Sequence, residues 1–416
     1  MKILIIGINY APEQVGVGKF TSEAAEWLAA RGHAVSVITA PPHYPHWRIG
    51  EGYSAWRYRR ENLAGVQVLR CPLWLPRRLT PLWRIVCCVS FALSSFFPLA
   101  WALLKNRPDI TLVIEPTFFS VPPAWALASL LRIPVWLHVQ DFELEAVRGL
   151  GYLSGGRLAR IAESVEGWLL RRLRRISTLT PQMDLQLERM RVPANRRILF
   201  PNWVDCSQIR PLAAASRFRR QLGIAADSVV LLYSGSFGRK HGLEIIIETA
   251  RLLRERPDLH FVLCGDGIEK DELRSGATGL ANISWLPLQD LDLLNELLNL
   301  ADIHLLPQRA AIADAVLPSK LTGMLASGRP VIATVEPGTA LAKIIAGTGI
   351  ATPPGDARCF ADAIIRLAAD HGLRKSLGDE ARRYAQAILD KTPILENFEA
   401  ALRDAVADRD NISGAA

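Results

Sequence analysis

The sequence predicts an α/β protein built from two doubly wound domains, each with a parallel sheet covered by helices on both faces. Apolar runs alternate with amphipathic segments along almost the whole chain, which is typical of βα units. The alternation restarts after Pro201-Asn-Trp-Val-Asp205, and 416 residues are enough for two cores. We therefore expect an N-terminal domain over residues 1–203 and a C-terminal domain over 204–390, facing each other across a cleft.

The first domain begins with an apolar run over 2–9, which predicts a strand, and continues with a helix over 19–30 that Gly32 closes. A polar, aromatic loop over 41–60 is longer than most connections. Further strands are expected over 33–39, 66–71, 110–115, 135–139 and 176–179, and helices over 81–105, 119–131 and 154–175.

The second domain repeats the pattern. Strands are expected over 229–233, 260–264, 283–286, 303–306 and 331–335, and helices over 218–223, 242–255, 291–300, 340–346, 356–370 and 372–389. The last segment, 391–416, is expected to carry a helix that crosses back to the first domain, with a frayed tail from Asp408.

Charge is distributed unevenly over the chain. The net charge is +8, but residues 1–200 hold 25 Lys/Arg and 14 Asp/Glu (+11), whereas 201–416 hold 24 and 27 (−3). Nine of the eleven tryptophans lie in the first half as well. A basic, tryptophan-rich half fits nucleic acid or an anionic membrane. No nucleic-acid-binding signature accompanies it, so we favour the membrane and expect no nucleic acid partner.

The segment Ile85–Leu104 is twenty residues long and uncharged, which is the length of a membrane span. It contains three serines and a proline and lies between strands of one domain, which argues against a span. Flanked by Arg84 and Lys105, it fits a helix at the bilayer interface, and a buried core helix is the alternative. The chain begins with a core strand, so we expect no signal peptide, and six scattered cysteines fit a reducing cytosol.

Ligands of doubly wound sheets bind beyond the carboxyl ends of the strands, so the loops there are the candidate sites. Gly16 and Gly18 follow the first strand and let backbone amides approach a ligand before a helix start. They form neither G-x-G-x-x-G nor a Walker A loop, which argues against a dehydrogenase or an ATPase. A plain glycine turn is the alternative.

The second domain offers a cradle for a diphosphate. Ser236, Arg239 and Lys240 follow its first strand, and Gly267 follows the next. The run Leu317–Ala333 combines a lysine-led turn, a helix, a stop at Gly328 and a buried strand. Within it, Ser319 and Lys320 stand at the helix start, where phosphate oxygens are favoured. Solvated basic side chains are the alternative for both segments.

His138 and Asp141 lie where the strand over 135–139 ends, and they are candidates for the catalytic groups. A histidine exchanges protons near neutral pH, and a carboxylate orients it or contacts substrate hydroxyls. A satisfied core histidine is the alternative.

Taken together, the motifs resemble those of GT-B glycosyltransferases of the family-4 type, most closely the sugar transferases of colanic-acid and related exopolysaccharide biosynthesis. The resemblance covers nearly the whole chain in order. The segments that carry it are Met1–Glu13 with Gly16 and Gly18, Val37–Pro45, Tyr233–Ser236 with Gly242–Glu244, Leu317–Leu321 and Thr352–Asp356.

The resemblance implies a retaining hexosyltransferase that uses a nucleotide diphosphate sugar, without cofactor or metal. It places catalysis at His138 and Asp141. It implies donor-binding roles for Gly16, Gly18, Ser236, Arg239, Lys240, Gly267, Ser319, Lys320 and Leu321. The chain departs from the family at Ala315 and Gly323, where many members carry a Glu-x7-Glu pair, and at Ser236 and His241, where many carry Arg and Lys.

The leading hypothesis is a cytoplasmic enzyme, peripheral to the inner face of the cytoplasmic membrane, that acts on a polyprenyl-diphosphate-linked saccharide. Two alternatives stay open. A nucleotide-sugar epimerase on the same architecture needs no acceptor, and a non-catalytic subunit binds nucleotide sugar without turnover.

Overall fold

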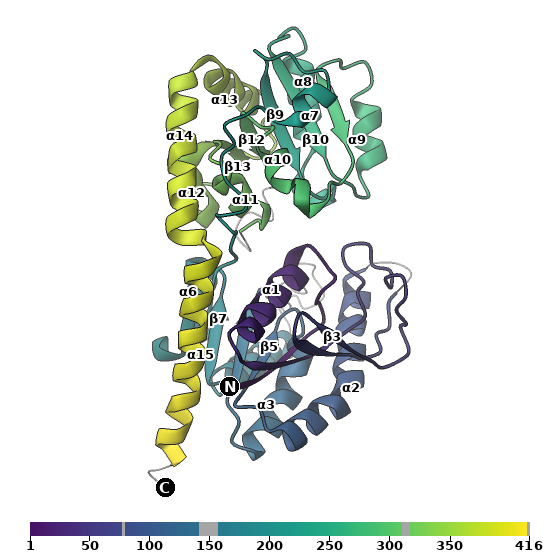
Figure 1. Cartoon of the computed structure of the whole chain (residues 1–416), viewed down its shortest axis with the longest axis vertical. Helices are drawn as coiled ribbons and strands as arrows, with labels where there is room; N and C mark the ends of the chain where they lie inside the picture. The colour runs from purple at the N-terminus through teal and green to yellow at the C-terminus, as the bar shows by residue number, and fades with distance from the viewer. Residues whose placement is uncertain (77–79, 141–156, 310–316, 414–416) are drawn as a thin grey trace. The chain divides into compact units, whose positions relative to one another are not determined.

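The computed structural model describes residues 1–76, 80–140, 157–309 and 317–413. The chain divides into two compact units (Figure 1). Unit 1 comprises Met1–Pro201 with Leu395–Ala416, and unit 2 comprises Asn202–Ile394. Each unit is a parallel-sheet α/β domain, so the predicted fold class is confirmed. Asp141 and Ala315 lie outside the described residues.

The sheet of unit 1 has the strand order β3-β4-β2-β1-β5-β6-β7-β8, and every neighbouring pair is parallel except β3 with β4. Its strands are β1 Lys2–Gly7, β2 Ala34–Thr39, β3 Arg59–Leu63, β4 Val66–Arg70, β5 Ile110–Ile114, β6 Val135–Val139, β7 Arg175–Thr178 and β8 Arg197–Leu199. The strands β5 and β6 are buried at every residue, as expected of parallel strands covered on both faces.

The helices of unit 1 follow its strands in the βα pattern. Within the described residues they are α1 Gly16–Ala30, α2 Pro81–Asn106, η1 Phe118–Ser120, α3 Val121–Leu130, α5 Arg157–Leu170, α6 Pro181–Arg189, η2 Ala194–Arg196 and α15 Lys391–Ser413, whose first four residues belong to unit 2. Helix α15 continues to Ser413, so the tail expected to fray from Asp408 is helical over most of its length.

The sheet of unit 2 has the order β11-β10-β9-β12-β13-β14 and is parallel throughout. Its strands are β9 Val229–Ser234, β10 Leu259–Cys264, β11 Ile283–Leu286, β12 Ile303–Leu306, β13 Val331–Thr334 and β14 Gly349–Thr352. Its helices are α7 Arg217–Gln221, η3 Arg239–His241, α8 Glu244–Leu252, α9 Lys270–Gly276, η4 Leu291–Leu293, α10 Leu294–Leu298, α11 Lys320–Ala326, α12 Ala340–Thr348, α13 Ala357–Ala369, α14 His371–Tyr384 and the π-helical η6 Ala385–Leu389.

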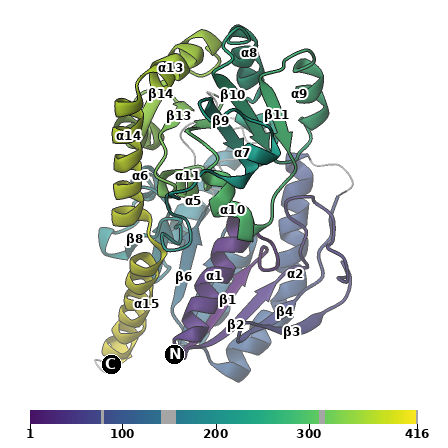
Figure 2. The ribbon, with the colours of Figure 1, turned by 45° about the horizontal axis from the view of Figure 1, so that its top comes forward.

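Strand alternation distributes the core of unit 2 between two helix layers. Leu231 and Tyr233 of β9 belong to the cluster with α8, α9 and α13, whereas Val230 and Leu232 belong to the cluster with α7 and α10. Figure 2 shows α8 and α13 on one side of these strands and α7 and α10 on the other. The strand ends, not the faces, are therefore left for ligands.

The run Leu317–Ala333 folds into α11, a turn and β13. Gly328 has a φ of 70°, the left-handed conformation expected of it, and Pro330 precedes β13. Ser319 precedes α11, but its side chain does not cap the helix.

Helix α15 is held to the rest of unit 1 through a buried carboxylate. The Glu399 side chain is 4% exposed and pairs with Arg31, with His33 at 3.0 Å and with Arg403 at 2.6 Å. On the same helix, the ring of Phe398 stacks on Phe200 with their centroids 4.0 Å apart. Both ionic and apolar contacts therefore join the C-terminal segment of unit 1 to its N-terminal segment.

Helix α2 presents an apolar stripe to solvent. It is continuous through Pro98, and Leu93, Phe97, Trp101 and Leu104 are 59–77% exposed. Their spacing of four, four and three residues places them on one helix face. By length and composition alone, 83–106 is the one helix within the described residues that is long and apolar enough to cross a membrane, and 28% of its apolar window is buried.

Candidate functional site

The candidate site of unit 2 lies where the strand order reverses. Strand β9 pairs with β10 on one side and with β12 on the other, and ligands of doubly wound sheets bind beyond the strand ends at such a point. The loop over 235–243 follows β9, and residues 307–309 follow β12. In unit 1 the reversal falls between β1 and β5, beside the loop that carries Gly16.

Lys320 reaches the loop after β9 from the start of α11. Its Nζ donates a hydrogen bond to Tyr233 Oη at 2.7 Å and lies 4.3 Å from the centroid of the Tyr233 ring. The Tyr233 hydroxyl donates to the carbonyl oxygen of Ser236, also at 2.7 Å. The Ser236 hydroxyl is 3.1 Å from Nε2 of His241. The structure therefore brings Lys320 and Ser236 together through a tyrosine.

Two glycines permit the close approach of these loops. Gly235 has a φ of 142°, and a Cβ there would lie 2.7 Å from Lys320 Nζ. Gly267, a predicted donor-binding residue, has a φ of 155°, and a Cβ there would lie 2.4 Å from the carbonyl oxygen of Phe237. Since only glycine adopts such backbone angles without strain, both positions are fixed by geometry.

Arg239 and Lys240 lie in η3, the short turn before α8. The Arg239 side chain is exposed, and its carbonyl oxygen accepts a hydrogen bond from Arg309 Nε at 2.6 Å. Arg309 also pairs with Glu244 at 2.8 Å and so joins the loops after β9 and β12. The Lys240 side chain lies outside the described part of the chain.

Ser319 and Leu321 flank Lys320 but differ in exposure. Ser319 is exposed, whereas Leu321 is 2% exposed and belongs to a core cluster with Met324 and Leu325. The Leu321 side chain therefore anchors the start of α11 in the core, and Ser319 faces solvent.

Two groups at this edge were missed by sequence reasoning. Tyr233 follows four aliphatic residues and is the next-to-last residue of β9, and that change of residue type is the signal that identifies it. Glu269 is 9% exposed, and its Oε2 has no hydrogen-bond partner within the described residues. Burial raises the pKa of the Glu269 carboxyl, and the Glu244 carboxylate raises it further.

In unit 1, Gly16 and Gly18 shape the start of α1 around a buried carboxylate. Gly16 begins the helix with a φ of 62°. A Cβ at Gly18 would lie 2.8 Å from Cβ and 2.7 Å from Oε2 of Glu13. Glu13 accepts hydrogen bonds from Asn9 Nδ2 at 2.9 Å and from the backbone N–H groups of His43 and Tyr44 at 2.9 and 3.0 Å.

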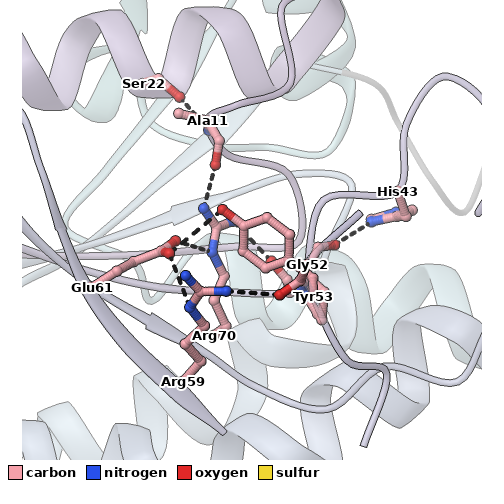
Figure 3. A network of polar contacts seen from close by, with 10 residues as sticks. Ala11, Ser22, His43, Gly52, Tyr53, Arg59, Glu61 and Arg70 are labelled. Atoms are coloured by element: carbon pink, nitrogen blue, oxygen red, sulfur yellow. Dashed lines mark hydrogen bonds and ion pairs between the residues drawn. The ribbon is translucent and has the colours of Figure 1, made fainter. Parts of the chain in front are cut away.

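A second network anchors the long loop of unit 1 to the sheet (Figure 3). Arg70, 1% exposed, donates to Glu61 at 2.6 Å, to the carbonyl oxygen of Ala40 at 3.0 Å and to that of Ala11. Arg59 donates to the carbonyl oxygen of Gly52 at 2.8 Å. The segment expected to be only a loop up to residue 60 thus ends in an edge strand, β3, whose charged side chains hold it.

His138 lies near the end of β6 as expected, but its side chain is 3% exposed. Its Nδ1 is 2.9 Å from Ser177 Oγ, and its ring lies 4.9 Å from the ring of Phe200. Burial lowers the pKa of His138 to about 3, so the ring is neutral near pH 7.

Two further features concern other ligands. Within the described ranges, no group of three His, Cys, Asp or Glu side chains has the arrangement to hold a metal ion.

A groove of about 610 Å³ lies between α8 and the turn before α13, lined by residues that include Arg251 and Arg358. None of the predicted site residues lines this groove.

Comparison with known proteins decides the family. Residues 15–203 match the family described as "Glycosyl transferase 4-like domain", and residues 215–384 match "Glycosyl transferases group 1". WcaI of Escherichia coli (strain K12), which carries the name of a colanic acid biosynthesis glycosyl transferase, is 42% identical over 96% of this chain and 98% of its own. The chain belongs to this glycosyltransferase family. The predicted family and the general activity of glycosyl transfer are confirmed.

Solved structures show the same GT-B fold. Sucrose-phosphate synthase from Thermosynechococcus elongatus has a TM-score of 0.76 at 20% identity and covers 98% of this chain and 99% of its own. HepE of Anabaena, solved with UDP-glucose, has a TM-score of 0.68 at 17% identity, with 97% and 100% covered. WaaG, a glycosyltransferase involved in lipopolysaccharide biosynthesis, has a TM-score of 0.66 at 16% identity, with 96% and 99% covered.

Proposed function

We propose that this chain transfers a hexose from a nucleotide diphosphate sugar to a saccharide acceptor, with retention of the anomeric configuration. The observation that carries the proposal is the Lys320 ammonium, held at the strand reversal of unit 2 beside the loop of Ser236 and Arg239. Cations at the end of such a strand can form charge-assisted hydrogen bonds with diphosphate oxygens. The UDP-glucose bound to HepE supports a donor of this class.

The chemistry that the protein must supply is stabilisation of a leaving group. When the bond between the sugar and the diphosphate breaks, negative charge develops on the diphosphate, and fixed cations lower the energy of that transition state. Lys320, Arg239 and Lys240 provide these charges. The proposed donor-binding residues of unit 2 are Ser236, Arg239, Lys240, Gly267, Ser319, Lys320 and Leu321, the last through its packing in the core next to Lys320. In unit 1 they are Gly16 and Gly18.

His138 and Asp141 are the proposed groups near the reacting sugar. Because the His138 ring is neutral near pH 7, its role there is a hydrogen bond or a shape constraint, and a cycle of proton exchange is not required of it. We assign the acceptor to unit 1 because the basic residues are concentrated in the first half of the sequence.

The proposed acceptor is a polyprenyl-diphosphate-linked saccharide of exopolysaccharide biosynthesis. The name of WcaI supports a pathway of this type. The exposed apolar stripe of α2 supports a lipid surface, since the exposed Lys105 beside Trp101 suits anionic headgroups. We propose a cytoplasmic enzyme that is peripheral to the inner face of the cytoplasmic membrane, a location that co-sedimentation with anionic vesicles tests.

The function is tested by incubating the purified chain with GDP-, UDP- and dTDP-sugars, with and without a lipid-linked saccharide. The proposal predicts that one donor is consumed only when acceptor is present, and that the new glycosidic bond keeps the donor's anomeric configuration. Conversion of a donor without acceptor supports the epimerase instead. Binding of donor without any turnover supports the non-catalytic subunit. An inverted product contradicts retention alone.

A further inference from the structure

We propose that Tyr233 is a positioning residue, which orients the Lys320 ammonium toward a nucleoside diphosphate. The inference rests on the proposed donor site and adds to it a buried residue that acts through Lys320. Tyr233 lies at the end of β9, and Lys320 begins α11, 87 residues further along the chain.

The hydrogen bonds at the tyrosine have a fixed direction. A phenol has a single proton, and the Tyr233 hydroxyl donates it to the carbonyl oxygen of Ser236 at 2.7 Å. Its lone pairs are therefore left to accept from Lys320 Nζ, also at 2.7 Å. The tyrosine thus couples the lysine of α11 to the backbone of the loop after β9.

The tyrosine holds the cation without cancelling its charge. Tyr233 is fully buried, and burial raises its pKa far above the ordinary value, with the nearby Glu269 carboxylate raising it further. The hydroxyl is consequently neutral near pH 7. A carboxylate in the same place would form an ion pair with Lys320 and compete with the diphosphate, whereas a neutral phenol does not.

Gly235 leaves the path of the lysine open. A Cβ at this position would lie 2.7 Å from Nζ and 3.1 Å from Cε of Lys320, so any larger residue displaces the ammonium. The arrangement of glycine, tyrosine and serine backbone therefore defines one place for the cation at the strand end.

The test is a double-mutant cycle on the dissociation constant of a nucleoside diphosphate, measured by calorimetry. UDP, GDP and dTDP are screened against the wild-type chain, and the nucleotide that binds is then titrated into Tyr233→Phe, Lys320→Ala and the double variant. We expect Tyr233→Phe to weaken binding by on the order of tenfold in the wild-type background and by less than about twofold beside Lys320→Ala. Tyr384→Phe, on α14 of the same unit, is the matched control and leaves binding unchanged.

A second variant covers the case in which Tyr233→Phe folds poorly. Gly235→Ala displaces the ammonium and is expected to weaken binding as well, and because Gly235 has a φ of 142° the folding of this variant is checked by circular dichroism before titration. Equal effects of Tyr233→Phe in both backgrounds, or an unchanged dissociation constant, overturn the positioning role while the donor proposal stands. If the wild-type chain binds none of the three nucleotides, the proposed donor site fails and the positioning role fails with it.

Discussion

Burial decides what the His138 and His304 side chains do. His138 and His304 are both buried, and desolvation lowers the pKa of each to about 3. Each ring is within 3.0 Å of a serine hydroxyl, Ser177 for His138 and Ser327 for His304. Such rings are neutral hydrogen-bonding groups at physiological pH, unlike a titrating general base.

The pH dependence of stability tests this assignment for His138. Its pKa is about 3 in the folded chain and about 6.5 when unfolded, so the unfolded state binds more protons between these values. The stabilisation is complete above pH 6.5 and is lost as the pH falls toward 3. From pH 6.5 to 4.5 we expect wild type to lose about 2 kcal/mol more than His138→Asn in urea unfolding. The exposed His371→Asn is the control, and parallel curves for wild type and His138→Asn would contradict the assignment.

Gly18 is predicted to be required for folding of the loop after β1. An added Cβ would lie 2.8 Å from Cβ of the buried Glu13, so Gly18→Ala should lower the free energy of unfolding by about 1–3 kcal/mol. Gly347→Ala, on α12 with nothing within 4 Å of the new methyl group, should be neutral or stabilising by up to about 1 kcal/mol. Urea denaturation of the two variants checks the difference, and equal stabilities would rule out the steric account.

At the scale of elements, the exposed stripe of α2 is the feature that an ordinary core helix does not explain. Replacing Leu93, Phe97 and Trp101 by Gln should weaken binding to anionic vesicles at least about tenfold, because each apolar side chain contributes on the order of 1 kcal/mol or more at a lipid surface. Vesicle sedimentation at low salt measures the fraction of protein bound. A control triple variant at Leu185, Leu252 and Ile388, which are exposed to 51–53%, should bind as wild type does. A wild-type chain that stays in the supernatant contradicts the membrane proposal.

Helix α15 should detach from unit 1 more easily in acid. Burial by itself raises the pKa of Glu399, but hydrogen bonds from Arg403, His33 and Arg31 outweigh it and lower the pKa to about 2. A carboxyl group with a depressed folded pKa stabilises the protein above its unfolded value of about 4.3, and this is lost as the pH falls toward 2. Glu399→Gln should therefore cost about 2 kcal/mol at pH 7 and little at pH 2.5. Hydrogen exchange of α15 amides measures the effect, and an equal cost at both pH values would contradict it.

Element types were predictable where the apolar pattern was strong. The strands over 135–139, 283–286 and 303–306 match β6, β11 and β12 to the residue. In contrast, β3 was missed because Arg59–Leu63 has no apolar alternation. The strand is held in place by the contact of its Glu61 with Arg70 of the neighbouring strand β4. The short strands β8 and β14 are set by their partners in the sheet, which a local pattern does not reveal.

At the scale of the whole molecule, the sequence located the loops of the site better than the contacts within it. Strand-end glycines and basic residues predicted the loop after β9 and the start of α11. The contact of Lys320 with Tyr233 joins residues 87 positions apart and depends on which strands are neighbours, so no local spacing predicts it. The burial of Leu321 follows from helix packing in the same way.

The central claim is that this glycosyltransferase uses Lys320 as a cation for the donor diphosphate. The most direct measurement compares sugar transfer to a lipid-linked acceptor by wild type, by Lys320→Ala and by Lys343→Ala, an exposed lysine of α12. The account predicts that Lys320→Ala lowers kcat/KM by about 100-fold or more with an unchanged melting temperature, whereas Lys343→Ala keeps the wild-type rate. Wild-type transfer by a folded Lys320→Ala protein would contradict it.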